Sequence, residues 1–262
     1  DATRLGYDFL GQAEGGWMSI TGEPNGEPMK VGVALVDIVT GIFAASATIA
    51  ALYGAQRDGE GQRVDLSLFE SAVATLVNVG SNYLVSGNPA KRFGNAHPNI
   101  VPYQIFGTAD GNIAIAIAAD RQYARFCELA GVSHLAQPPY EKNADRLAHR
   151  AQLIELLNPV LKSKPTDEWM RMLEAEGIPA GVVRTVDQVF ESPQAKARDM
   201  VVVIEHPTAG EVRLSGLPYK LSGSPLTIYR HPPLLGEHTD EVLGEIGYSG
   251  EEIADLRQSG AL

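Results

Sequence analysis

The chain of 262 residues carries a formal net charge of -11 at pH 7, with 44% hydrophobic and 20% charged residues. This composition is that of a globular protein of one large or two modest domains, and it excludes a fibrous repeat or a disordered chain. The negative charge repels phosphate backbones and anionic lipid, so we expect neither nucleic acid nor a membrane as a partner. The single cysteine, Cys127, excludes an intrachain disulfide, and we predict a buried structural role for it in a cytoplasmic protein.

The N-terminal stretch LGYDFLGQAEGG places Asp8 where a helix begins. As an N-cap, the Asp8 carboxylate would satisfy backbone amides of a helix through Phe9, Leu10 and Ala13. As a functional group, it would be an anion stabilised at a helix N-terminus and ready to attack an electrophilic carbonyl. The local sequence leaves both interpretations open.

Residues 31–55 form the most apolar stretch of the chain. Because this stretch contains Asp37 and is built largely from small residues, it predicts a buried core helix from about Asp37, not a membrane span. A polar turn and a short strand, QRVDLSL, are predicted next. Ser67 and Glu70 then form a capping box at the start of a helix that runs to Val79.

The segment SGNPAKRFGNAHPNIVPY, residues 86–103, is dense in glycine, asparagine and proline and predicts an ordered irregular loop. After it, YQIFGTADGNIAIAIA predicts two strands joined by a turn at Asp110. Several helices follow, one of them capped by Thr166. From Met200 the pattern predicts two further strands and then a short final helix capped by Ser249.

Sequence motifs for metal and nucleotide sites do not occur in this chain. The six histidines are scattered, without the i, i+4 spacing of a helical metal site, so we expect no metal site. Neither a phosphate-binding loop nor a dinucleotide fingerprint is present, and no serine lies in a nucleophile-elbow pattern. We expect no permanently bound cofactor.

Six stretches, in this order, resemble the C-terminal portion of class III coenzyme A transferases of the CaiB/BaiF type, the family that also includes α-methylacyl-coenzyme A racemases. They are GYDFLGQAEGG, ITGEPNGEPMKVGVALVDIVTGIFAASATIAAL, GEGQRVDLSLFESAVATL, KRFGNAHPNIVPYQIFGTADG, EHPTAGEV and PPLLGEHTDEVLGEIGYSGEEIADLRQSG. The resemblance implies an α/β fold, with a Rossmann-like large domain that is incomplete here, a smaller α+β domain and an interlocked homodimer. It further implies that about the first third of a full-length enzyme, with most coenzyme A contacts, is absent from this sequence.

With this resemblance the chain is expected to divide into three parts. Residues 1–92 belong to the large α/β domain and its linker helices, residues 93–190 form the small α+β domain, and residues 191–262 return to the large domain.

The resemblance implies that Asp8 is the catalytic nucleophile. It also places the loop GNAHPNIVPYQ at an active site, which makes its polar side chains candidate substrate contacts: Asn95, His97, Tyr103 and Gln104. From the residues alone, these side chains would only stabilise the loop through hydrogen bonds.

The loop and the preceding NYLVSGNPAKR look closest to family members that move coenzyme A between succinyl-coenzyme A and other dicarboxylic acids. A dicarboxylic acceptor is therefore expected, with Lys91 or Arg92 as partners for its second carboxylate. Taken singly, each is also consistent with a solvated surface charge.

The implied reaction moves coenzyme A between an acyl-coenzyme A, with succinyl-coenzyme A foremost, and a small carboxylic acid through an aspartyl thioester. The coenzyme A thioester is a substrate here. One alternative is a racemase that uses Asp8 as half of an acid/base pair; racemases tend to have a glutamate where this chain has Asp120. The other is a non-catalytic half that assembles with a partner polypeptide.

Overall fold

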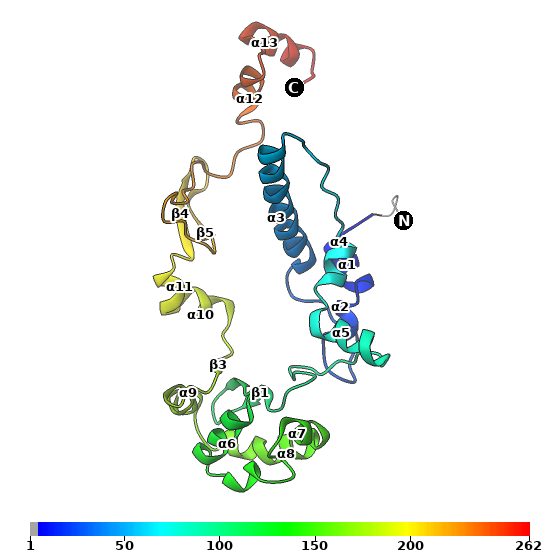
Figure 1. Cartoon of the computed structure of the whole chain (residues 1–262). Coiled ribbons are helices and arrows are strands. Elements are labelled where there is room, and N and C mark those ends of the chain that lie inside the picture. Colours follow the sequence, from blue (N-terminus) through cyan, green and yellow to red (C-terminus); the bar gives the residue numbers. More distant parts are fainter. Residues whose placement is uncertain (1–4) are drawn as a thin grey trace. The chain divides into compact units, whose positions relative to one another are not determined.

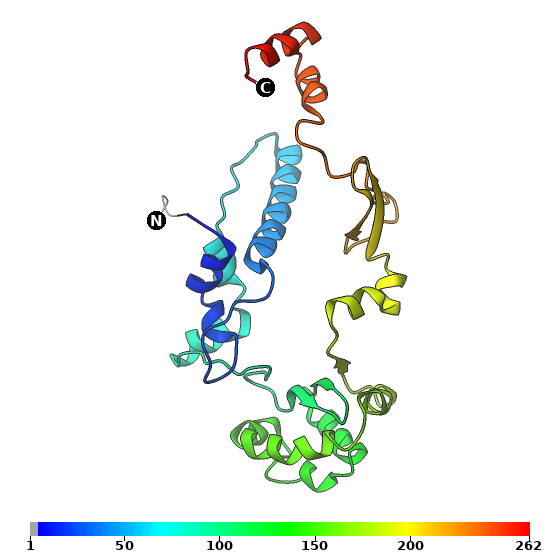
Figure 2. The ribbon, with the colours of Figure 1, turned by 180° about the vertical axis from the view of Figure 1, so that it is seen from behind.

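The computed structural model describes residues 5–262 of the chain, which divides by its internal contacts into two compact units, one ending at Val183 and the other Arg184–Leu262. The helices of the first unit are α1 (Asp8–Glu14), α2 (Trp17–Ile20), α3 (Leu35–Asp58), α4 (Leu68–Ala74), α5 (Val77–Ser86), α6 (Asp120–Leu129), α7 (Asn143–Ala148), α8 (Arg150–Leu161) and α9 (Thr166–Ala175), with a short 3-10 helix at Ser133–Ala136. Its strands are β1 (Tyr103–Gly107), β2 (Asn112–Ala116) and β3 (Ala180–Val182). Figures 1 and 2 show these elements from opposite sides.

The hydrophobic core of the first unit lies between Val101 and Ile178, a part that we call the core region. Its sheet has the order β1-β2-β3 with antiparallel pairing, and the hairpin predicted around Asp110 is confirmed. Alternate residues of β2 face the core, as the period of two in a strand requires. The core residues that are buried to 2% exposure or less include Phe106, Ile113, Ile115, Tyr123, Phe126, Cys127, Leu153, Leu157, Leu161, Trp169 and Leu173.

One charged side chain, Arg146, is fully buried in the core region. Its guanidinium donates to the carbonyl oxygens of Val101, Tyr140 and Glu141 and to Oδ1 of Asp120. It also stacks over the Tyr123 ring, 4.2 Å from the centroid. A buried cation is tolerated when its donors are satisfied, and here they tie α7 to the start of α6 and to the segment before β1.

Cys127 is buried among the same apolar side chains, as predicted. Burial raises the pKa of its thiol, which keeps the sulfur protonated and unreactive. The structural role expected from the sequence is confirmed.

The helices α1 to α5 pack with much less burial than the core region, and we call residues 5–86 the helical region. The capping box predicted at Ser67 is confirmed, because its Oγ accepts the backbone N–H of Glu70. The helix expected to continue to Val79 is interrupted after Ala74, and α5 begins at Val77. Gly15 allows α1 to approach α4 closely, since a Cβ there would lie 2.4 Å from that of Ala72.

Two expectations for the helical region are wrong. Residues 60–67 are extended but pair with no strand among the described residues, so QRVDLSL does not form a strand. The apolar helix α3 forms and packs against α1 and α4, yet Val36 is its only buried residue in this chain. By length and composition α3 also passes as a membrane span, with a mean hydropathy of 2.0 and 6% of its most apolar window buried.

The second unit consists of short elements. They are α10 (Val186–Glu191), α11 (Pro193–Ala197), β4 (Val201–His206), β5 (Gly210–Ser215), α12 (Thr239–Glu245) and α13 (Gly250–Gln258). The two strands pair antiparallel, which confirms the hairpin predicted after Met200, and Ser249 caps α13 as expected. The fold is of mixed helix and sheet, and no strand pair within residues 5–262 is parallel. The three-part domain division stays a prediction.

Candidate active site

The Asp8 carboxylate connects two helices that are far apart in sequence. Asp8 is the first residue of α1, but Tyr7 is the N-cap and makes no side-chain cap hydrogen bond. Instead, Oδ1 of Asp8 accepts the backbone N–H of Val36, in the first turn of α3, at 2.8 Å, and Oδ2 accepts Nε2 of Gln12 at 2.7 Å. The interpretation of Asp8 as a cap of its own helix is therefore wrong, because its carboxylate caps α3.

A second carboxylate, Asp37, lies directly after Val36 in the first turn of α3. Its side chain is exposed and makes no hydrogen bond or ion pair with any residue from 5 to 262. The N-terminus of a 24-residue helix stabilises a negative charge at this place. Two carboxylates thus lie at the start of α3. Both oxygens of Asp8 accept hydrogen bonds, whereas those of Asp37 accept none from the described residues.

Two residues near the start of α3, Gln12 and Asp37, are not among the site residues predicted from the sequence, although local signals point to both. Gln12 lies four residues after Asp8, which is the spacing of neighbours on one helix face. The sequence predicts the start of the apolar helix near Asp37, where an acidic residue is typical, but it assigns Asp37 no chemical role.

The predicted loop residues lie together at the edge of the sheet. Asn95, Tyr103 and Gln104 line a pocket of about 320 Å³ with residues of β2 and β3. His97 is not in its lining but contacts Tyr103, with ring centroids 5.0 Å apart, and its backbone N–H donates to the Tyr103 carbonyl at 2.9 Å. Asp8 forms hydrogen bonds with none of these four residues among the described part of the chain.

The surroundings of the His97 imidazole favour its neutral form. Burial, followed by the positive charge of Arg150, lowers the pKa of His97. Its Nδ1 accepts the backbone N–H of Asn99 at 3.0 Å, so a proton on the neutral ring belongs on Nε2. His97 therefore shapes the loop through an acceptor nitrogen, and Arg150 supports the same loop by donating to the carbonyl oxygens of His97 and Pro98.

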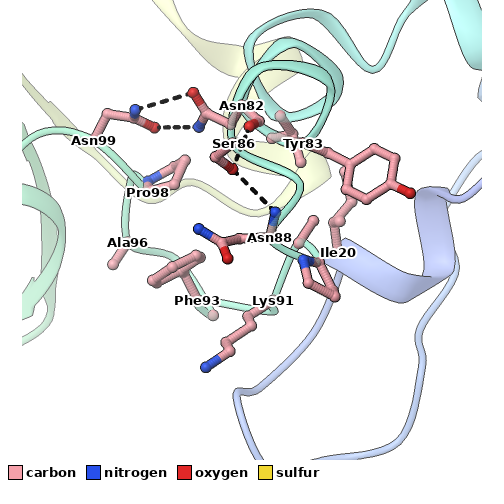
Figure 3. Close-up of a pocket in the computed structure, with 14 residues that line it drawn as sticks. Ile20, Asn82, Tyr83, Ser86, Asn88, Lys91, Phe93, Ala96, Pro98 and Asn99 are labelled. Atoms are coloured by element: carbon pink, nitrogen blue, oxygen red, sulfur yellow. Dashed lines mark hydrogen bonds between the residues drawn. The ribbon is translucent and has the colours of Figure 1, made fainter.

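A second pocket, of about 280 Å³, lies between α2, α5 and the loop after α5, as Figure 3 shows. Lys91 is among the lining residues, whereas Arg92 is already occupied: its guanidinium donates to the carbonyl oxygens of Glu23 and Gly26. On the wall of this pocket, the Asn82 and Asn99 carboxamides join α5 to the loop with a hydrogen bond of 2.9 Å.

Lys91 lies in the lining of this pocket, and its assignment as the partner of a second carboxylate stays a prediction.

Asp120, the position that bears on the racemase alternative, belongs to the hydrogen bonds around the buried Arg146. Its Oδ1 accepts Nη2 of Arg146 and the backbone N–H of Asn143, each at 2.9 Å. Among residues 5–262, no group of three or more histidine, cysteine, aspartate or glutamate side chains is placed to hold a metal ion.

Comparison with known proteins matches residues 1–239 to the family described as CoA-transferase family III. The chain is 40% identical to the succinate--glutarate CoA-transferase of Agrobacterium fabrum, covering 92% of this chain and 60% of that protein. It is 36% identical to the succinyl-CoA:glutarate CoA-transferase of Homo sapiens, covering 99% and 60%. Among solved structures, a CaiB/BaiF family protein from Brucella suis matches with a TM-score of 0.76 and 40% identity, over 94% of this chain and 64% of the other. The chain thus spans about 60% of the length of the curated relatives it matches.

Proposed function

Because this chain belongs to the CoA-transferase family III, we propose that the protein moves coenzyme A between succinyl-coenzyme A and a small dicarboxylic acid. Two relatives that match over more than nine tenths of the chain are named for transfer between succinyl-coenzyme A, or succinate, and glutarate. The observation in this chain that carries the proposal is the pair of aspartates at the start of α3, Asp8 and Asp37. A carboxylate at a helix N-terminus is the group that such an exchange requires.

The proposed exchange passes through a mixed anhydride and an aspartyl thioester. An aspartate carboxylate attacks the thioester carbonyl of the donor, giving a mixed anhydride and the coenzyme A thiolate. The thiolate attacks the aspartyl carbonyl and releases the donor acid, which leaves an aspartyl thioester of coenzyme A. The acceptor carboxylate then attacks this thioester, and the same two steps run in reverse to give the new acyl-coenzyme A and the free aspartate. Exclusion of water from the anhydride preserves the energy of the thioester.

The resemblance assigns the attack to Asp8, and that assignment stays a prediction. The hydrogen bonds favour Asp37, because an attacking oxygen must leave its partners, and Asp8 would give up either the Val36 cap or the Gln12 contact. Asp37 has no such partners among the described residues and is exposed. We therefore propose Asp37 as the attacking carboxylate, with Asp8 holding the helix turn that presents it.

A homodimer and a cytoplasmic location belong to the same proposal. The homodimer is supported by the apolar side chains that α3 exposes in this chain, among them Ile42, Ile49, Leu52 and Tyr53. Light scattering on the protein at its natural length is expected to give the mass of two chains. A stable monomer at micromolar concentration would contradict this part.

The experiment that tests the activity is isotope exchange. Labelled succinate is incubated with unlabelled succinyl-coenzyme A and the protein at its natural length, and label is expected to enter the thioester. Replacing succinate by glutarate is expected to give glutaryl-coenzyme A. Absence of exchange, with deuterium from heavy water entering the α-carbon of a branched acyl-coenzyme A instead, would establish the racemase and overturn the transferase.

A further inference from the structure

Gln12 is a polar side chain that is fully buried in α1, with 0% exposure. Its Nε2 donates to Oδ2 of Asp8 at 2.7 Å and to the carbonyl oxygen of Val33 at 3.3 Å. Its Oε1 accepts the backbone N–H of Val31 at 2.8 Å. The partners fix which end of the carboxamide is nitrogen, because Asp8 and Val33 offer acceptors and Val31 offers a donor.

These contacts tie α1 to the segment that leads into α3. Val31 and Val33 lie in that segment, and the second oxygen of Asp8 binds the N–H of Val36 at its end. Gln12 and Asp8 together therefore hold residues 31–36 at three backbone positions. The next residue along the chain is Asp37.

A structural role alone explains only part of this arrangement. A buried carboxamide must be hydrogen-bonded, and the Val31 and Val33 backbone groups satisfy its oxygen and one of its two N–H groups; any acceptor would satisfy the second N–H. The additional bond to Asp8 is short and charge-assisted, and it fixes the orientation of a carboxylate at the candidate active site.

We propose that Gln12 is a positioning residue for acyl transfer. It holds the Asp8 carboxylate in one orientation and fixes the path of residues 31–36, so that the start of α3 presents Asp37 in one place. This inference rests on the proposed function. Since a displacement of about 1 Å at a reacting group costs up to about 100-fold in rate, loss of the Gln12 contacts is expected to lower kcat.

The test compares three variants of the protein at its natural length. Gln12→Met keeps the volume and removes every hydrogen bond. Gln12→Glu restores the donor to Asp8 only when its carboxyl group is protonated. Trp17→Phe is the matched control, because it removes a hydrogen bond to the Ala72 carbonyl in the same group of helices without touching Asp8.

The expected result for Gln12→Met is a fall in kcat of about 10- to 100-fold, with KM for the acyl-coenzyme A changed less than about threefold. Trp17→Phe is expected to keep kcat at a similar loss of thermal stability. The activity of Gln12→Glu relative to Gln12→Met is expected to rise as the pH falls from about 8 to about 6, since protonation restores the donor.

Two outcomes separate the inference from the function on which it rests. Transfer by the unchanged protein with equal kcat in Gln12→Met, or a pH-independent ratio of the two Gln12 variants, would overturn the positioning role alone. No transfer by the unchanged protein would overturn the proposed function and, with it, this inference.

Discussion

The helical region, residues 5–86, and the core region, from Val101 to Ile178, use their side chains in opposite ways. The core region buries a continuous set of aromatic and aliphatic side chains around one sheet. In the helical region, two of the few buried residues, Gln12 and Ser71, are polar, and most of the apolar surface of α3 is exposed in this chain. The core region therefore supplies stability that this chain holds by itself, whereas the helical region carries the carboxylates proposed for chemistry.

The largest effect is expected on the rate of exchange, from a substitution at Asp37 in the helical region. Asp37→Asn removes the proposed attacking carboxylate, and kcat for exchange is expected to fall at least about 1000-fold, because an amide does not form the anhydride. The side chain is exposed and unpaired among the described residues, so the expected loss of stability is only that of its interaction with the helix N-terminus, about 0.3 to 1 kcal/mol. Steady-state exchange and thermal denaturation measure the two quantities.

Asp8→Asn is the matched comparison for that variant. Asparagine caps a helix about as well as aspartate, so α3 is expected to keep its start and the protein to retain measurable transfer. A fall in kcat of about 1000-fold in Asp8→Asn, with Asp37→Asn still active, would assign the nucleophile to Asp8 instead.

The next largest effect is expected in the core region. Trp169 is 1% exposed and donates from Nε1 to the Leu161 carbonyl at 2.8 Å. Trp169→Ala is expected to lower the free energy of unfolding of this region by about 3 to 5 kcal/mol, through the cavity and the unpaired carbonyl. Hydrogen exchange of peptides from residues 101–182 in increasing urea measures it.

Leu52→Ser, on the exposed face of α3, is the control for that prediction. It is expected to leave the unfolding free energy of the core region within about 0.5 kcal/mol of the unchanged protein. Equal losses from Trp169→Ala and Leu52→Ser would show that the two regions share one core and would remove the contrast between them.

A smaller effect is expected from the cap of α4 in the helical region. Ser67→Ala deletes the oxygen that accepts the Glu70 N–H, at an expected cost of about 0.5 to 2 kcal/mol in the stability of that region. Ser67→Asp keeps an acceptor and is expected to restore most of it. Hydrogen exchange of residues 68–74 reports both, and identical protection in the two variants would contradict the role of the cap.

The smallest effect is expected in the pH dependence of stability, through His97 in the loop before the sheet. The pKa of His97 is lowered in the folded protein, so the unfolded chain binds a proton more readily. The stability linked to His97 is complete above the unfolded value of about 6.5 and is lost as the pH falls from there towards the folded value. His97→Gln is expected to reduce this loss in urea titrations at two pH values; an unchanged difference between them would argue against it.

Local signals were sufficient for most elements of the fold. The hairpin at Asp110 and the caps at Ser67 and Ser249 depend on residues within a few positions of each other, and the structure confirms all three. Cys127 was predicted correctly because an amphipathic period shows which helix face is buried.

The failures concern partners that are distant in sequence. Asp8 caps α3 through Val36, 28 positions away, and no local pattern reveals that contact. The burial expected for α3 assumed that an apolar helix is covered, but the sequence does not tell which surface covers it. Arg92 contacts a turn that comes more than sixty residues earlier, which no local pattern reveals either. The assignment of Lys91 or Arg92 to a second carboxylate stays a prediction.

The covalent intermediate offers the most direct test of the proposed chemistry. Trypsin separates the two aspartates, because cleavage after Lys30 and Arg57 places Asp8 in one peptide and Asp37 in the peptide of residues 31–57. The protein at its natural length is given succinyl-coenzyme A without acceptor, digested briefly with trypsin at neutral pH, quenched with acid and analysed by mass spectrometry. We expect a coenzyme A adduct on the peptide of residues 31–57. An adduct confined to the Asp8 peptide would move the nucleophile to Asp8, and transfer that proceeds with neither peptide modified would contradict the aspartyl thioester itself.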